Sequence, residues 1–252
     1  GRNGRVVTVV VSRPERLKAI DKVTWGGLGD AVVVLGAGVA VGCIVLRGAG
    51  DAAVSPRADL SEFEAGRTDR AKARAYNTTV GRTIDELEAC RDPTLALIKG
   101  VCVGGGLEVA AFCDMRFCGQ SSKFGVPIKR LGLVMAYAEL RGIVNLVGRA
   151  KTLEILLEGR IFGSDEALRM GLVNRIDADD EVEAECYATA CRVAEGAPLV
   201  ARFHKQALIR LADPTPLSNE EIEASLDCYA SEDFHIGYRA FLDKISPEFK
   251  GR

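Results

Sequence analysis

The sequence lacks the residue patterns that build metal sites and disulfide frameworks. It contains two histidines, His204 and His235, and none of its eight cysteines belongs to a CxxC pair. Zinc sites and disulfide scaffolds depend on closely spaced ligands or paired cysteines, so the sequence predicts neither a metal nor a disulfide framework. Most of the cysteines lie in apolar stretches, where we expect them to be buried as small hydrophobic residues in a reducing cytoplasm.

A long apolar run and an excess of one charge are also missing. With 33 Lys and Arg against 35 Asp and Glu, the formal net charge is −2, which offers no broad basic field to nucleic acid or to an acidic membrane surface. The apolar stretch 31–46 contains three glycines and ends in strand-like residues, so it does not predict a membrane span. The N-terminal residues show no signal-peptide pattern. We therefore expect a cytoplasmic protein without a nucleic-acid or membrane partner.

Two glycine motifs of nucleotide-binding proteins, GxxxxGK[ST] and GxGxxG, do not occur, which argues against a P-loop or a dinucleotide-binding fingerprint. Three consecutive glycines are nevertheless present at 104–106, after the apolar run 95–98 and before the helix-like run 107–112. This pattern predicts a strand, a tight turn and a helix. By itself, such a turn is often only a device for close packing.

The predicted turn has the chemistry of an oxyanion site. The first N–H groups of a helix have no partner inside it and point out of its positive end, where they stabilise a negative oxygen on a thioester or ester carbonyl. Glu108 is one turn into the same helix and could reach the reacting carbon. The alternative is that Glu108 only interacts favourably with the helix dipole.

The order of predicted elements indicates an α/β protein of one large domain, or of one domain with an appendage. We expect strands at 5–12, 42–46, 93–103 and 115–118, and a loop at 124–134. Helices are expected at 21–34, 67–90, 136–158 with a break at Gly148, and 164–170. After 180 the pattern is helical only. We therefore expect an α/β core over 1–180 and a helical C-terminal region over 181–252.

Five segments in this order resemble the crotonase (enoyl-CoA hydratase/isomerase) superfamily. The most specific is GVCVGGGLEVAAFCDMRF at 100–117, which is similar to GxAxGGGxELALxCDxR. The others are SRPERLKAID at 12–21, GAGDAAVSPRADL at 48–60, EGRIFGSDEALRMGLVNRI at 158–176 and SEDFHIGYRAFLDKISPEF at 231–249. The resemblance implies a spiral of ββα units with a C-terminal helical region that forms trimers or hexamers.

The resemblance also implies an acyl-CoA thioester as substrate, with coenzyme A as part of that substrate and no separate cofactor. Two backbone N–H groups would hold the thioester oxygen as it gains enolate character, and by position they belong to Ala58 and Gly105. Glu108 matches a catalytic glutamate of the family.

The same resemblance implies, by position, which residues contact coenzyme A. They are expected from Arg16, Lys18, Pro56, Arg57, Asp59, Leu60, Gly104 and Lys244. Arg57 stands where the family has a glycine and Lys18 where it has an asparagine; each could contact a phosphate, or form only a surface ion pair or a solvated side chain. Lys244 matches a lysine that is near the CoA end in the family and could serve a neighbouring subunit.

Two departures from the family pattern concern the chemistry. In FGVPIK, Ile128 stands where hydratases of the family carry a second glutamate, and hydration is easiest with two carboxylates. The next segment, GLVMAYAELRGI, has lost central glycines and gained Tyr137 and Glu139. Either could project into the site and replace the acid, or be a packing residue and a solvated helix residue respectively.

We expect an acyl-CoA enzyme of the enoyl-CoA hydratase/isomerase type. The missing second glutamate keeps other outcomes on the same scaffold open, namely decarboxylation, isomerisation or thioester hydrolysis. A protein that binds acyl-CoA without turnover is the remaining alternative, against which the retained Glu108 argues.

Overall fold

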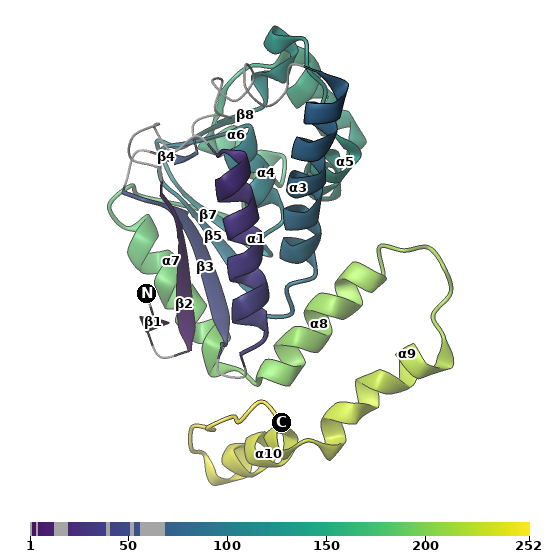
Figure 1. Cartoon of the computed structure of the whole chain (residues 1–252). Helices are drawn as coiled ribbons and strands as arrows, with labels where there is room; N and C mark the ends of the chain where they lie inside the picture. Colours follow the sequence, from purple (N-terminus) through teal and green to yellow (C-terminus); the bar gives the residue numbers. More distant parts are fainter. Residues whose placement is uncertain (1, 4, 13–19, 39–40, 51–52, 56–68) are drawn as a thin grey trace.

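The computed structural model describes residues 2–3, 5–12, 20–38, 41–50, 53–55 and 69–252, which form two β-sheets with helices around them (Figure 1). The larger sheet has the strand order β1 (Arg2–Asn3), β2 (Val6–Val11), β3 (Cys43–Gly48), β5 (Thr94–Ile98), β7 (Met115–Gly119), β10 (Arg175–Asp177). Its strands pair in parallel except for β1. The smaller sheet has the order β4 (Ala53–Ser55), β6 (Val101–Val103), β8 (Lys123–Gly125), β9 (Phe162–Gly163), with β9 antiparallel.

The chain passes repeatedly from the larger sheet to the smaller one and then into a helix. Strands β3 and β4 precede α3 (Arg70–Glu88), β5 and β6 precede α4 (Gly105–Ala111), and β7 and β8 precede the 3₁₀ helix η2 (Pro127–Leu131) and α5 (Tyr137–Glu158). The smaller sheet then ends with β9, and α6 (Ser164–Arg169) leads from it to β10. This arrangement confirms the predicted spiral of ββα units.

The prediction of one strand over 93–103 was wrong. Lys99 and Gly100 interrupt the apolar stretch, Gly100 has a positive φ of 70°, and the chain turns there from the larger sheet into the smaller one. Both strands are largely buried, and the Lys-Gly pair between them was the signal that the prediction passed over. The predicted loop at 124–134 was also wrong in part, since it contains the end of β8 and the whole of η2.

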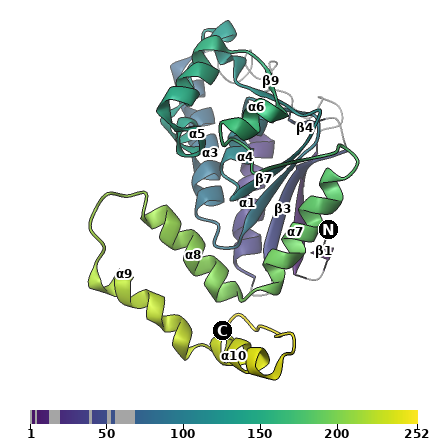
Figure 2. The ribbon, with the colours of Figure 1, turned by 180° about the vertical axis from the view of Figure 1, so that it is seen from behind.

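Both faces of the larger sheet are covered, which explains its continuous apolar strands. In β3, Ile44 and Leu46 belong to the core shared with α1 (Lys22–Gly36) and α3, whereas Cys43 and Val45 pack with α7 (Val182–Glu195). Strand β5 alternates in the same way. Figures 1 and 2 show α1 and α3 on one face and α7 on the other.

Several predicted helix ends are confirmed by specific contacts. Asp21 caps α1 by accepting a hydrogen bond from the Thr24 amide at 2.7 Å. Gly148 interrupts α5 with a φ of 71°. In the C-terminal part, the helical stretch predicted after residue 180 forms separate helices, because Pro198 begins a new one, α8 (Pro198–Arg210).

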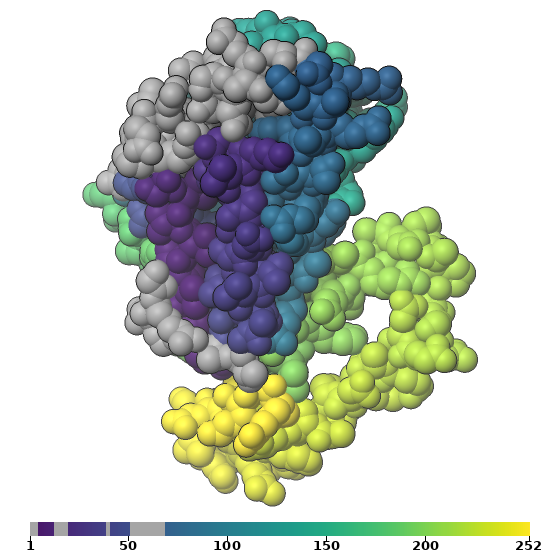
Figure 3. All heavy atoms as spheres, viewed as in Figure 1, coloured from purple at the N-terminus to yellow at the C-terminus, as the bar shows by residue number. Residues whose placement is uncertain are grey.

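The C-terminal helices differ in their relation to the core. Helix α7 covers the larger sheet. The predicted boundary between the core and the C-terminal region, at residue 180, therefore separates this helix from the sheet on which it packs. Helices α8, α9 (Asn219–Glu223) and α10 (Glu232–Asp243), with η3 (Ala224–Ala230), extend away from the core (Figures 1 and 3). None of the helices in the described part of the chain is long and apolar enough to cross a bilayer.

Buried ion pairs fix α8 to the core. Arg202 donates from Nε to Oδ1 of Asp92 at 2.7 Å, and the two side chains are 10% and 1% exposed. One turn along, Lys205 forms an ion pair with Asp114 at 2.9 Å. The Asp114 carboxylate also accepts hydrogen bonds from the amide and hydroxyl of Thr94. These contacts set the direction in which the C-terminal helices leave the core.

We expect Arg202→Met to lower the free energy of unfolding by about 3–5 kcal/mol, because it leaves the Asp92 carboxylate buried without its partner. Urea denaturation measures this change. The control is Arg252→Met, which breaks an ion pair with Glu232 whose side chains are 75% and 45% exposed, so it should cost at most about 1 kcal/mol. Equal losses in the two variants would contradict the role given to the Asp92–Arg202 pair.

Candidate active site

The turn between β6 and α4 is held in a conformation that only glycine adopts readily. Gly104 has φ 55° and ψ −122°, and its amide donates to the carbonyl of Gly125 in β8 at 3.0 Å. Gly105 begins α4, and its N–H donates to no backbone carbonyl among the turns and caps that the described residues form. The amide of Gly105 is therefore available at the positive end of the helix.

The other end of α4 is fixed by Arg116, which is 3% exposed. Its guanidinium donates to the carbonyls of Cys113 at 2.5 Å, Ala110 at 3.4 Å and Leu172 at 2.8 Å. Burial lowers the pKa of Arg116. Carbonyls at the C-terminal end of a helix have no partner within it, and a cation there also interacts favourably with the dipole. Arg116 thus holds α4, and with it the glycine turn, in place.

A cavity of about 490 Å³ opens in front of the N-terminus of α4. Its walls come from α1, α3, the glycine turn, η2 and the start of α5, and most of them are apolar. The wall residues are Ile20, Trp25, Ala73, Tyr76, Asn77, Val103, Gly104, Gly105, Glu108, Val126, Pro127, Ile128, Arg130, Leu131, Gly132, Leu133, Val134 and Glu139. A largely apolar cavity with a few convergent polar groups is typical of a site for a small molecule.

The structure brings Gly105 and Glu108 together in this cavity, as the sequence predicts. Glu108 is 7% exposed, and its Oε2 atom lies 3.9 Å from the point where a Cβ on Gly105 would stand. A ligand oxygen that accepts the Gly105 N–H would therefore have the carboxylate beside its neighbouring carbons. Gly104, predicted to contact coenzyme A, lines the same cavity, and a Cβ added there would have no atom of the described residues within 4 Å.

Ile128 and Glu139 also line the cavity. Ile128 is on η2 and presents an apolar, partly buried side chain where the family pattern has an acid. Glu139 is on the first turn of α5, where its Oε2 accepts the amide of Ala136 at 2.5 Å. Its carboxylate therefore caps a helix and also faces the cavity. Whether it replaces the missing acid stays a prediction.

The structure does not bring two other predicted residues into the cavity. Tyr137 begins α5 but its side chain is 93% exposed and is not among the wall residues. Its hydroxyl therefore does not replace the missing acid within this chain. Lys244 ends α10 with a φ of 55°, and α10 lies far from α4 in both views of the ribbon. A contact of Lys244 with the ligand of this same chain is not supported, and its role toward a neighbouring subunit stays a prediction.

The remaining predicted residues lie outside the described part of the chain. These are Ala58, the expected second donor to the thioester oxygen, and the expected CoA contacts Arg16, Lys18, Pro56, Arg57, Asp59 and Leu60. Their roles stay predictions.

Most of the apolar wall residues were missed by the sequence analysis, among them Ile20, Trp25 and Tyr76. Ile20 and Trp25 are 1% exposed and Tyr76 is 5% exposed, and all three also belong to the main hydrophobic core. For Trp25 on α1 and Tyr76 on α3, the helical spacing gives the same signal whether the residue faces the core or a ligand. The one signal that could have marked Trp25 is that it is the only tryptophan in the sequence.

Cysteine and metal chemistry finds no support in the described residues. Burial raises the pKa of the Cys102 thiol, just before the turn, and raises the pKa of Cys113 in the segment after α4 to about 12. A thiol with such a pKa is protonated at neutral pH and is a poor nucleophile. Within the residues described, no group of three His, Cys, Asp or Glu side chains could hold a metal ion.

Comparison with known proteins identifies the family. The profile of the enoyl-CoA hydratase/isomerase family matches residues 1–252. The chain belongs to this family. A Mycobacterium bovis protein named "Probable enoyl-CoA hydratase echA8" is 30% identical over 253 residues, covering 100% of this chain and 96% of the relative. The short-chain-enoyl-CoA hydratase of Clostridium acetobutylicum is 28% identical, covering 100% and 97%.

Solved structures confirm the crotonase fold. An enoyl-CoA hydratase/carnithine racemase from Magnetospirillum magneticum is similar with a TM-score of 0.98 and 43% identity, covering 100% of this chain and 94% of the other. An enoyl-CoA hydratase/isomerase family protein from Hyphomonas neptunium has a TM-score of 0.95 and 32% identity, covering 100% and 97%. The predicted family, fold class and enzyme type are therefore confirmed.

We expect Gly104→Ala to lower the free energy of unfolding by about 1–3 kcal/mol, because alanine is strained at a φ of 55°. The new methyl group would meet no atom of the described residues within 4 Å, so the loss is expected from the backbone and not from a clash with them. The control is Gly105→Ala in the helical turn that follows, whose methyl group would lie 3.5 Å from Trp25, an ordinary contact. Thermal unfolding measures both, and equal losses would contradict the conformational role of Gly104.

Proposed function

We propose that this chain converts an enoyl-CoA thioester through an enolate whose oxygen is held by the Gly105 amide. The observation that carries the proposal is that the Gly105 N–H and the Glu108 carboxylate border the same apolar cavity. A positioned donor of this kind is usually worth about 2.7–4 kcal/mol in the transition state. The second donor would be the amide of Ala58.

Glu108 would move the proton that enolate chemistry requires. Removal of a proton from the acyl chain places negative charge on the thioester oxygen, and return of the proton to another carbon of the chain shifts the double bond. One carboxylate suffices for this shift. Hydration also requires that a water molecule be held and deprotonated, which is easiest with a second acid or base.

The identity of residue 128 favours isomerisation over hydration as the main outcome. Ile128 has no titratable atom, so it cannot share acid and base duties with Glu108. Glu139 is the one other carboxylate among the wall residues and would be the partner if hydration prevails. The apolar walls contributed by Leu131, Leu133 and Val134 suit a hydrocarbon chain.

We expect Glu108→Gln to lower kcat by about 10²–10⁴-fold, the usual contribution of a positioned acid or base. KM should change little, because the amide side chain keeps the shape of the cavity wall. Steady-state assays with a four-carbon trans-2-enoyl-CoA and its 3-enoyl isomer measure both reactions.

Two further variants separate the carboxylates. Ile128→Glu should raise the rate of hydration, since it restores the second acid. Glu139→Gln should cost less than Glu108→Gln. A Glu108→Gln enzyme with unchanged turnover, or a larger loss from Glu139→Gln, would overturn the assignment. Turnover only of a malonyl-type or β-keto acyl-CoA would identify a decarboxylase or hydrolase, and binding without turnover would identify an acyl-CoA-binding protein.

We further infer that the chain forms a homotrimer or a dimer of trimers in the cytoplasm. Support comes from the large apolar side chains that α8 to α10 and their connections leave exposed. These are Val200, Leu208, Ile209, Leu211, Leu217, Ile222, Leu226, Tyr229, Phe234, Tyr238, Phe241, Leu242 and Ile245. Apolar surface on this scale is typical of a subunit interface.

Phe241→Asp should therefore dissociate the oligomer, because it places a charge on a side chain that is 82% exposed in the single chain and would be buried in the assembly. Sedimentation velocity at micromolar concentration measures the change. The control is Val23→Asp on α1, at a side chain 81% exposed, which should leave the assembly intact. A wild-type chain that sediments as a monomer would contradict the assignment.

A further inference from the structure

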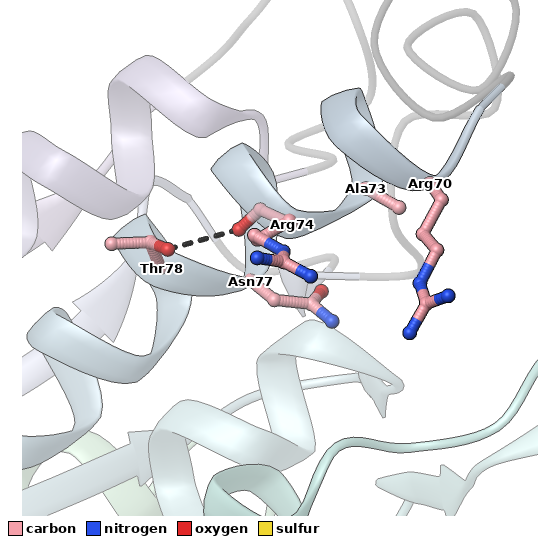
Figure 4. A pocket seen from close by; sticks show the side chains of 5 residues that line it. All are labelled: Arg70, Ala73, Arg74, Asn77 and Thr78. Carbon is pink, nitrogen blue, oxygen red and sulfur yellow. Dashed lines mark hydrogen bonds between the residues drawn. The ribbon is translucent and has the colours of Figure 1, made fainter.

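A second hollow of about 460 Å³ adjoins the cavity on the outer side of α3. Its walls are Arg70, Ala73, Arg74, Asn77 and Thr78, on successive turns near the start of the helix (Figure 4). Ala73 and Asn77 line both this hollow and the cavity that contains Glu108. The two spaces therefore lie next to each other along α3, and a ligand that extended past these two residues would leave the cavity for the hollow.

The hollow carries positive charge that no carboxylate neutralises among the residues that the structure describes. Arg70 and Arg74 are four residues apart, so their side chains lie on one face of the helix, and like charges in this spacing destabilise a helix slightly. Both residues are exposed, and neither has a carboxylate within 4.0 Å among the described ion pairs. By contrast, Arg82 of the same helix pairs with Asp30 at 3.0 Å and Glu86 at 3.5 Å.

Other polar groups of the hollow are arranged around the same space. Figure 4 shows the guanidinium groups of Arg70 and Arg74 and the amide of Asn77 on the same side of α3. The Thr78 hydroxyl donates to the backbone carbonyl of Arg74 at 3.0 Å, so this hydrogen bond does not involve the Arg74 guanidinium. Asp69, the adjacent acid, accepts the Lys72 amide at 2.9 Å as the helix cap.

We propose that Arg70 and Arg74 bind a carboxylate at the far end of a short acyl chain, so that the substrate class is a monothioester of a dicarboxylic acid. The proposal rests on the proposed function, which places the thioester carbonyl at Gly105. From there the chain would pass Tyr76 and Ala73. Arg70 is six residues ahead of Tyr76 on α3, or about 9 Å along the axis, a span that an extended chain of several carbons and the long arginine side chain can cover together.

Two chemical arguments favour a carboxylate, rather than a phosphate of coenzyme A, as the group that Arg70 and Arg74 bind. Guanidinium groups match the planar carboxylate and bind it in a bidentate manner. A ligand that runs from the Gly105 amide to the hollow would follow the largely apolar wall of the cavity, which suits a hydrocarbon chain better than a polyphosphate. The amide of Asn77, at the junction, can donate to the carboxylate or to a polar group of the chain.

The test compares two substrates that differ only at the far end. These are the CoA thioester of trans-2-hexenedioic acid and its uncharged counterpart with a terminal carboxamide. The wild-type enzyme should prefer the carboxylate by about tenfold in kcat/KM, and the preference should decline as the ionic strength rises. The double variant Arg70→Gln/Arg74→Gln should lose this preference while keeping its kcat/KM for the carboxamide.

Two controls make the result specific. Lys72→Gln removes one charge from the same turn of α3 without lining the hollow, and it should keep the preference. Arg74→Lys keeps the charge but not the planar fork, and it should retain only part of the preference. The dissociation constant of free coenzyme A, measured by calorimetry, should be the same in the wild type and the double variant.

The outcomes distinguish this proposal from the proposed function. Turnover of the carboxamide without preference for the carboxylate would overturn the dicarboxylate proposal and leave the enoyl-CoA activity standing. A double variant that binds free coenzyme A tenfold more weakly would assign the arginines to a CoA phosphate and overturn the proposal. Failure of the wild type to convert either substrate, although it binds both, would overturn the proposed function instead.

Discussion

The hydrogen bond from the Gly104 amide to the Gly125 carbonyl, at 3.0 Å, is the contact on which the candidate site depends. It joins the turn after β6 to the end of β8 while Gly104 holds a conformation that other residues avoid. The chain can then begin α4 with the Gly105 amide facing the cavity and Glu108 one turn later. A small change in this turn would separate the donor from the carboxylate.

The rest of the fold holds the turn rigid from several directions. Arg116 binds the carbonyls at the far end of α4, and the ββα spiral places β6 and β8 side by side in the smaller sheet. Packing on both faces of the larger sheet fixes β5, which leads into β6. The Asp92–Arg202 pair then sets the direction of α8, the start of the surface that we assign to subunit contacts. Catalysis and assembly thus share one framework.

The sequence predicted the parts of the site that depend on local chemistry. The glycine turn, the position of Glu108 in the helix after it, and the alternation of strands and helices follow from propensity and spacing. The predicted continuous strand over 93–103 failed because a single Lys-Gly pair separates two equally apolar strands, and the apolar pattern does not show that they belong to different sheets. The exposure of Tyr137 and the capping contact of Glu139 could not be predicted either, because they depend on how α5 starts relative to η2.

The proposed function depends on the Gly105 amide polarising the thioester carbonyl of an acyl-CoA. The most direct measurement is the ¹³C NMR shift of a saturated acyl-CoA labelled at the thioester carbonyl, free and bound to the enzyme. A strong hydrogen bond withdraws electron density from the carbonyl carbon. We expect the bound resonance to move downfield and to do so equally in Glu108→Gln, which leaves the amide in place. A bound resonance at the position of the free thioester would contradict the account.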